Sequence, residues 1–133
     1  MNAAILVSPG ELLDKITILE IKKSRIRQKE KLVAVNRELK LLKITLAEML
    51  KYNKKLTVKL STEKKKLKAV NVKLWDIENR IRGKEAKGKF DKEFITLARS
   101  VYITNDKRSE IKNSINKLFG SSIHEVKQYR SYK

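Results

Sequence analysis

The chain contains no cysteine, which excludes disulfide bridges, thiolate nucleophiles and zinc sites built on thiolates. Its single histidine, His124, has no second histidine or cysteine with which to form a metal site, so we expect a surface residue in the tail. The four glycines form no phosphate-binding loop, and no strong catalytic motif is present. The sequence therefore predicts neither a metal site nor a cofactor.

Long hydrophobic runs are also missing. No apolar segment approaches the roughly 18–20 residues that a membrane-spanning helix needs. The first seven residues lack a basic region and are too short for a secretory signal peptide. We therefore expect a cytoplasmic protein with no membrane span.

Helix breakers are scarce, with one proline and four glycines among 133 residues. Charged residues make up 36% of the chain, which is typical of long helices with charged outer faces. Hydrophobic residues make up 41%, enough for the modest core of one domain of ordinary size. These proportions predict a single all-α domain over residues 1–133, built as an antiparallel helical bundle or as helical hairpins.

The first helix has a clear start signal. Ser8 is a good N-cap, Pro9 suits the first helical position, and Glu11 completes a capping-box pattern. Apolar residues then recur at helical spacing from Leu12 to Ile26, which predicts a helix over about residues 9–27.

A longer apolar heptad runs from Leu32 to Ile81 and permits two structures. One is a single coiled-coil helix of about 50 residues. The other, which we favour because the chain buries more by folding back on itself, is a helical hairpin with its turn near residues 53–62. The polar Asn53 and Glu63 interrupt the seam there, and the residues between them include weak helix formers.

The last helix is predicted to begin after Asp91, a plausible N-cap, and to stop at Gly120. Its apolar seam continues from Phe94 to Leu118, and the polar Thr104 and Arg108 interrupt it. Residues 4–7 and 121–132 have an extended pattern, and we expect these short extended termini to pair as a two-stranded ribbon.

Charge of one sign dominates, with 33 basic against 15 acidic residues and a net charge of +18. Residues 22–73 hold 18 basic and four acidic residues, so most of the excess positive charge lies in the middle of the chain. An AT-rich genome favours lysine but favours glutamate as well, so codon bias does not explain the whole excess. The middle segment is predicted to bind DNA or RNA weakly, without sequence preference and with strong salt dependence.

Three polar clusters flank the apolar seams, and each has a structural alternative. The first cluster, on the first helix, also fits solvated ion pairs, and Trp75 of the second also fits packing at the bundle edge. The third also fits a buried network; it consists of Arg99, Tyr102, Asn105, Asp106 and Arg108. As a functional site, the clusters are predicted to line one concavity between the first, third and fourth helices that binds an anionic, ring-bearing molecule such as a sugar nucleotide. The predicted ligand-binding residues are Lys15, Glu20, Trp75, Glu78, Arg82, Arg99, Tyr102, Asn105 and Asp106.

The same clusters carry a family resemblance. Residues 8–22, 74–82 and 90–108 resemble the three motifs of a bacterial family of unknown function, and the similarity extends over nearly the whole chain. Members of this family are linked to glycosyltransferases of cell-surface polysaccharide, which implies a pathway and no mechanism. The lysine-rich residues 51–73 depart most from the family pattern, so a family-wide function is expected at the clusters.

Three functions remain in competition. The first is a non-catalytic helical binding or accessory protein, either a monomer or a homodimer, that acts in surface-polysaccharide biosynthesis. The second is a non-specific nucleic-acid-binding protein, which rests on net charge alone. The third is a small helical enzyme that stabilises an anionic transition state, for which the candidate residues are Arg99, Arg82, Lys15 and Glu20.

Overall fold

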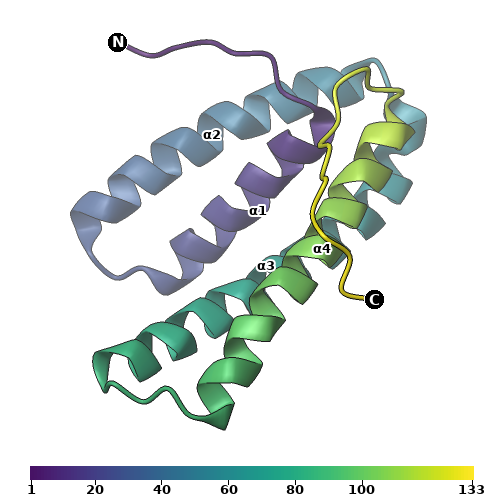
Figure 1. Cartoon of the computed structure of the whole chain (residues 1–133). Coiled ribbons are helices and arrows are strands. Elements are labelled where there is room, and N and C mark those ends of the chain that lie inside the picture. The colour runs from purple at the N-terminus through teal and green to yellow at the C-terminus, as the bar shows by residue number, and fades with distance from the viewer.

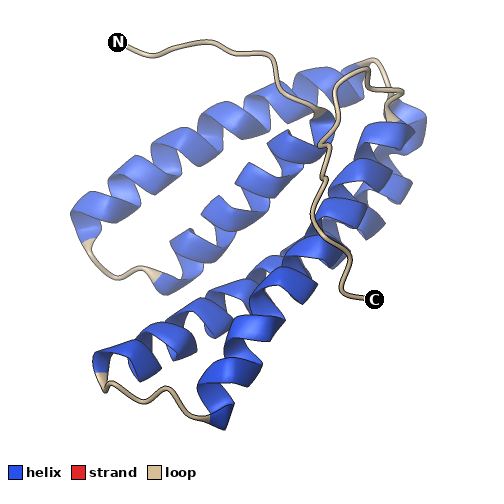
Figure 2. Cartoon of the chain, viewed as in Figure 1, coloured by secondary structure: helices blue, strands red, loops and turns tan.

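A computed structural model describes all residues 1–133 and confirms the all-α prediction (Figure 1). No strand is present, so the predicted terminal ribbon does not form (Figure 2). The elements in chain order are α1 (Pro9–Arg25), α2 (Lys29–Lys51), the short 3₁₀-helix η1 (Lys54–Leu56), α3 (Thr57–Ala86) and α4 (Lys92–Leu118).

The four helices form two hairpins, α1 with α2 and α3 with α4, as Figure 1 shows. Helix α1 packs against all three other helices, whereas the contacts of α2 are mainly with α1 and η1. The central position of α1 explains its composition, because a helix packed on several sides needs more than one buried face. Eight of its 17 residues are buried, compared with two of 23 in α2.

The predicted reversal of the chain within residues 32–81 is confirmed, and a continuous helix is excluded, but the two halves pack mainly against α1 and α4 and not against each other. Helix α2 ends at Lys51, and the chain reverses through Tyr52, Asn53 and η1. The Asn53 side chain donates a hydrogen bond to the Met49 carbonyl oxygen at 3.0 Å and so closes the last turn of α2. The turn is shorter than predicted, because residues 57–62 already form the first turns of α3.

The start signals are confirmed in part. The Ser8 hydroxyl accepts a hydrogen bond from the Glu11 backbone N–H at 3.2 Å, and Asp91 caps α4 by accepting from the Phe94 N–H at 3.0 Å. The second half of the capping box is absent, because the Glu11 carboxylate binds Lys112 instead. Gly120 has a φ of 60° and follows α4, a left-handed conformation in which glycine is favoured at helix ends.

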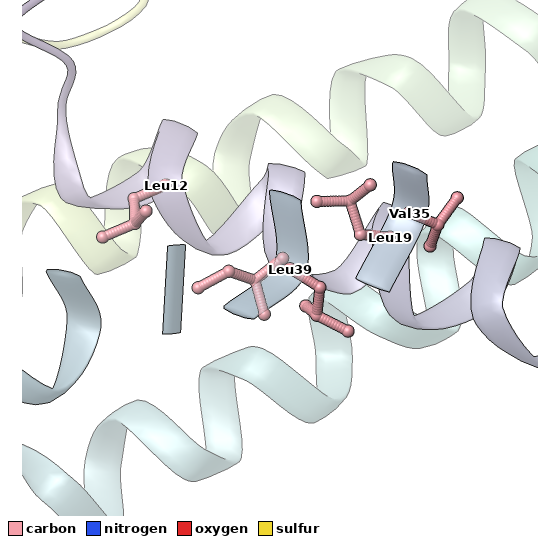
Figure 3. Close-up of a cluster of buried hydrophobic side chains, with 5 residues drawn as sticks. Leu12, Leu19, Val35 and Leu39 are labelled. Atoms are coloured by element: carbon pink, nitrogen blue, oxygen red, sulfur yellow. The ribbon is translucent and has the colours of Figure 1, made fainter. Parts of the chain in front are cut away.

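Two apolar clusters lie on either side of α1. Leu12, Ile16 and Leu19 pack against Val35 and Leu39 of α2, and the labelled members of this cluster are drawn in Figure 3. On the other side, Leu13 packs against three buried residues from α3 and α4, which are Leu60, Leu67 and Ile115. The predicted seams therefore face the core, and α1 joins the two hairpins into one body.

Candidate functional site

Polar side chains are buried where α1 meets α3 and α4. The Asp14 side chain is 1% exposed, and Thr17 and Asn71 beside it are also buried. A buried carboxylate loses its hydration, so it must be compensated by donors or cations. We call this group the polar junction; it consists of Asp14, Thr17, Asn71, Arg108, Lys112 and Asn116.

Asp14 is compensated mainly by Arg108 of α4. The Arg108 Nε donates to Asp14 Oδ1 at 2.9 Å, and its Nη2 pairs with Asp14 Oδ2, which makes the contact bidentate. The Asn71 Nδ2 donates to Asp14 Oδ1 and to the Thr17 hydroxyl, each at 2.9 Å. The hydrogen bonds to Asp14 raise the pKa of Arg108, and they outweigh the burial that acts against its charge.

Lys112 is the second cation of the junction and, unlike Arg108, is buried. Burial disfavours its charge, but the hydrogen bond to Glu11 and the charges of Asp14, Glu11 and Glu125 outweigh that effect and raise its pKa. Its Nζ lies 2.8 Å from Glu11 Oε2 and 3.4 Å from Glu125 Oε2. Lys112 therefore joins the start of α1, helix α4 and the C-terminal tail through one ammonium group.

The start of α1 approaches α4 closely at Gly10. The Gly10 N–H donates to Asn116 Oδ1 at 2.6 Å. A Cβ atom at position 10 would lie 2.3 Å from the Lys112 carbonyl oxygen, so no larger residue fits without a shift of the backbone. This contact explains in physical terms why a glycine stands in the second position of the helix.

A groove of about 410 Å³ lies beside the polar junction, between α1, α3 and α4. Trp75 and Glu78 line its α3 side, and Arg108 reaches it from α4 while its guanidinium remains paired with Asp14. The lining residues are Ile18, Ile21, Asn71, Leu74, Trp75, Glu78, Asn79, Arg82, Asn105 and Arg108.

Four of the nine predicted ligand-binding residues meet in this groove: Trp75, Glu78, Arg82 and Asn105. Arg82 is mostly exposed, and its Nε lies 3.3 Å from Glu78 Oε2 one turn earlier on α3. Asn105 accepts a long hydrogen bond of 3.4 Å from Arg108 Nη1. The groove therefore combines an indole ring, two guanidinium groups, one carboxylate and three amides.

The prediction of a single concavity for all nine residues is wrong. Lys15 faces α2, where its Nζ pairs with Glu38 at 3.1 Å. Glu20 is bound to Lys64 and Lys68 of α3 at 2.7 and 3.3 Å. Arg99 is exposed on α4 and does not line the groove. These residues lie beside the seams as predicted, but α1 has several packed sides, so its flanking residues do not all turn toward the same neighbours.

Tyr102 and Asp106 lie together in a different place, under the C-terminal tail. The Tyr132 hydroxyl donates to Asp106 Oδ2 at 2.6 Å, and the Tyr132 and Tyr102 rings meet edge to face with centroids 5.0 Å apart. Lys127 lies 3.9 Å from Asp106 Oδ1. The tail thus runs back along α4 (Figure 1), and this packing takes the place of the predicted pairing with residues 4–7.

The centre of the site lies outside the predicted set of ligand-binding residues. Asp14 and Arg108 lie in the polar clusters of the first and last helices but were not among the predicted ligand-binding residues. Their pairing agrees with the structural alternative of a buried network for the cluster that holds Arg108. Asn71 and Lys112 belong to none of the predicted clusters. A signal was present, because Arg108 interrupts the α4 seam and an arginine at a seam position requires a buried partner. Its partner lies 94 residues away, and no local spacing identifies it.

No group of three or more metal-binding side chains occurs in the structure, and none of its helices is long and apolar enough to cross a membrane. No curated protein and no solved structure matches the chain. One family model matches residues 3–132, which covers all three motifs and the polar junction, and its description gives no activity or ligand. The chain belongs to that family, DUF6165, a family of unknown function.

Proposed function

We propose that the protein is a non-catalytic binding or accessory module whose groove between α1, α3 and α4 takes a small anionic ligand that carries a ring. The observation that carries this proposal is the placement of Trp75 and Arg82 in one groove beside a guanidinium that Asp14 holds in place. An aromatic face and orienting polar groups are the usual elements of a small-molecule site.

Arg82 is the group best placed to bind the anion. Its side chain is 78% exposed and has one exposed ion-pair partner, Glu78, so a phosphate or carboxylate can displace that contact at little cost. Arg108 is already paired with Asp14, so it contributes a guanidinium group held at a fixed position in the wall of the groove. The Trp75 indole offers a surface on which a base or sugar ring can stack.

A sugar nucleotide has both chemical features that the groove selects, a ring and a diphosphate. The resemblance to proteins linked to surface-polysaccharide glycosyltransferases supports the same ligand class. The enzyme alternative is weaker, because its candidates Lys15, Glu20 and Arg99 do not share the groove with Arg82.

Fluorescence of the single tryptophan tests this proposal, because Trp75 lies in the groove. Titration with UDP-glucose is expected to quench or shift the emission with saturation. Arg82→Ala should weaken binding by about ten-fold or more, the cost of one charge-assisted contact. Arg80→Ala is the matched control, since Arg80 is two positions away and binds Glu93 outside the groove.

Arg99→Ala is a second control and is expected to bind as the unchanged protein does. Equal losses in the Arg82, Arg80 and Arg99 variants would indicate general charge attraction and would exclude the groove. Absence of any response to UDP-glucose, UDP and inorganic pyrophosphate would exclude the ligand class.

Non-specific binding of nucleic acid is the second candidate, and the exposure of the lysines favours it. Of the 18 basic residues in 22–73, only Arg25, Lys64, Lys66 and Lys68 form ion pairs. The expected result is weak binding to unrelated DNA duplexes that falls steeply between low and physiological salt. A sequence-specific complex that resists salt would make nucleic-acid recognition the leading function.

A further inference from the structure

The turn that joins α2 to α3 presents exposed apolar side chains next to exposed lysines. Tyr52 is 80% exposed and Val58 is 78% exposed, so both present most of their apolar surface to the solvent. Four lysines surround them, all exposed. We call this surface the basic tip; it consists of Lys51, Tyr52, Lys54, Lys55, Val58 and Lys59.

The lysines of the basic tip have no partner within the protein. None of the four forms an ion pair, whereas most acidic side chains of the chain do. The nearest acidic residues along the chain are Glu48 and Glu63, and Glu63 is bound to Lys66 at 2.9 Å. Lys117 at the end of the neighbouring helix α4 adds a further exposed cation. The tip therefore presents uncompensated positive charge.

Folding of the turn does not require these side chains. Asn53 closes α2 through its bond to Met49, and the Thr57 hydroxyl donates to the Lys54 carbonyl oxygen at 2.8 Å. The apolar anchors of the hairpin are Leu50 and Leu60, which pack on the core beside Leu13. Tyr52 and Val58 are mostly exposed and so contribute little to that core, which leaves their side chains free for a partner.

We propose that the basic tip docks onto the anionic surface of a phospholipid bilayer. Lysines near such a surface are attracted by the negative lipid headgroups, and tyrosine and valine side chains gain by entering the headgroup region. The apolar pair is what favours a bilayer over nucleic acid, because a phosphate backbone offers Val58 nothing to bury against.

The geometry keeps the groove free during docking. Trp75 lies on α3, whose first turn holds Val58 and Lys59 of the tip, but it is 18 residues after Thr57, roughly 27 Å along the axis of α3 at the usual rise per residue. A protein held to the membrane by the tip therefore keeps the groove open to the solvent. The docking proposal stands on the tip alone and does not depend on the ligand of the groove.

The experiment is co-sedimentation of the full chain with vesicles of phosphatidylcholine alone and with vesicles that contain phosphatidylglycerol as well. Binding is expected only to the anionic vesicles and is expected to weaken with salt. Replacement of the tip lysines should lower the partition coefficient by about ten-fold or more. That variant is K51Q/K54Q/K55Q/K59Q, and its control of equal charge is K87Q/K89Q/K92Q/K107Q, in which all four exposed lysines also lack ion pairs.

A second variant separates a membrane from a general polyanion. Tyr52→Ser combined with Val58→Ser keeps every charge, and it should lose vesicle binding several-fold while its binding to a DNA duplex remains unchanged. If this double variant bound vesicles as well as the unchanged protein does, charge alone would explain the binding, and the proposal would be overturned. Equal losses in the two lysine variants would do the same, because the charge would then act diffusely.

Insertion of the tip into the bilayer can be measured directly. Because the chain has no cysteine, a single introduced cysteine can be labelled at one chosen position. Tyr52→Cys labelled with an environment-sensitive fluorophore is expected to shift to the blue on anionic vesicles. The same label at Lys89→Cys should not shift. A blue shift at both positions, or at neither, would show that the tip is not the docking surface.

Discussion

Gly10 is a residue at which α1 and α4 approach each other closely. Gly10→Ala places a Cβ against the Lys112 carbonyl, a backbone atom that cannot rotate away. We expect a loss of about 1–3 kcal/mol in the free energy of unfolding, as for other overpacked sites. The matched control is Gly83→Ala in α3, where nothing lies within 4 Å of the new methyl group. This control should gain about 0.5–1 kcal/mol, and urea denaturation of both variants measures the contrast.

Asp14 is the residue on which the polar junction depends. Asp14→Asn removes the negative charge that faces Arg108 and leaves a guanidinium in a mostly dry site. The expected loss is about 3 kcal/mol, near the lower end for a broken buried ion pair because Arg108 keeps some contact with water. Denaturant unfolding gives this value.

A double variant distinguishes the ion pair from simple packing. Asp14→Leu with Arg108→Leu removes both charges at once, so no unpaired ion remains. We expect this variant to be more stable than the two single losses added together predict. Strict additivity would show that the two residues act separately, against the bidentate geometry.

At the scale of helices, Glu20 ties α1 to the first half of α3. Burial opposes ionisation of Glu20, but the hydrogen bonds and charges of Lys64 and Lys68 outweigh it, so the net result is a lowered pKa. A lowered pKa means that the stabilisation is complete above the unfolded value of 4.5 and is lost as the pH falls through the folded value.

Glu20→Gln tests this linkage. We expect it to cost about 1 kcal/mol at neutral pH, as for a favourable ion pair near the surface. The difference from the unchanged protein should shrink as the pH is lowered below about 4.5 and should vanish in strong acid. Thermal unfolding of both proteins across this range checks the prediction, and a constant difference at every pH would contradict it.

Local signals predicted the helices well, because they depend on neighbours in the chain. The cap at Ser8, the break at Asn53 and the stop at Gly120 all act within a few residues. The same locality explains why Trp75, Glu78 and Arg82 were placed together correctly, since they share one helical face.

The positions of elements relative to one another could not be predicted in this way. The pairing of Asp14 with Arg108 depends on which side of α1 faces α4, and α1 buries residues toward three helices at once. For the same reason Lys15 and Glu20, only five positions apart, bind different helices. Arg99 was expected in the groove because of its spacing from Tyr102, but that spacing orients both residues only with respect to α4.

Across the molecule, paired and unpaired charged side chains are unevenly distributed. The polar junction and groove involve the start of α1, the second half of α3 and the middle of α4, where acidic and basic side chains are paired. Most basic residues of α2, the turn and the first half of α3 form no ion pair; the exceptions are Lys64, Lys66 and Lys68. Residues 51–73 belong to both regions, because Leu60 and Leu67 are buried in the core whereas Lys54, Lys55 and Lys59 are exposed.

The C-terminal tail packs against α4, and Tyr132 forms part of this contact. The hydrogen bond to Asp106 raises the pKa of Tyr132 to about 12, because loss of the proton would place two negative charges side by side. A raised value means that the contact is intact below pH 10 and is lost as the pH rises through about 12.

Ultraviolet titration of the four tyrosines should therefore show a late ionisation that Tyr132→Phe removes and Tyr129→Phe leaves in place. Tyr132→Phe should also speed proteolytic cleavage of the tail, since the freed segment is then open to a protease. Persistence of the late step in Tyr132→Phe would show that another tyrosine carries it and that the tail is not held at Asp106.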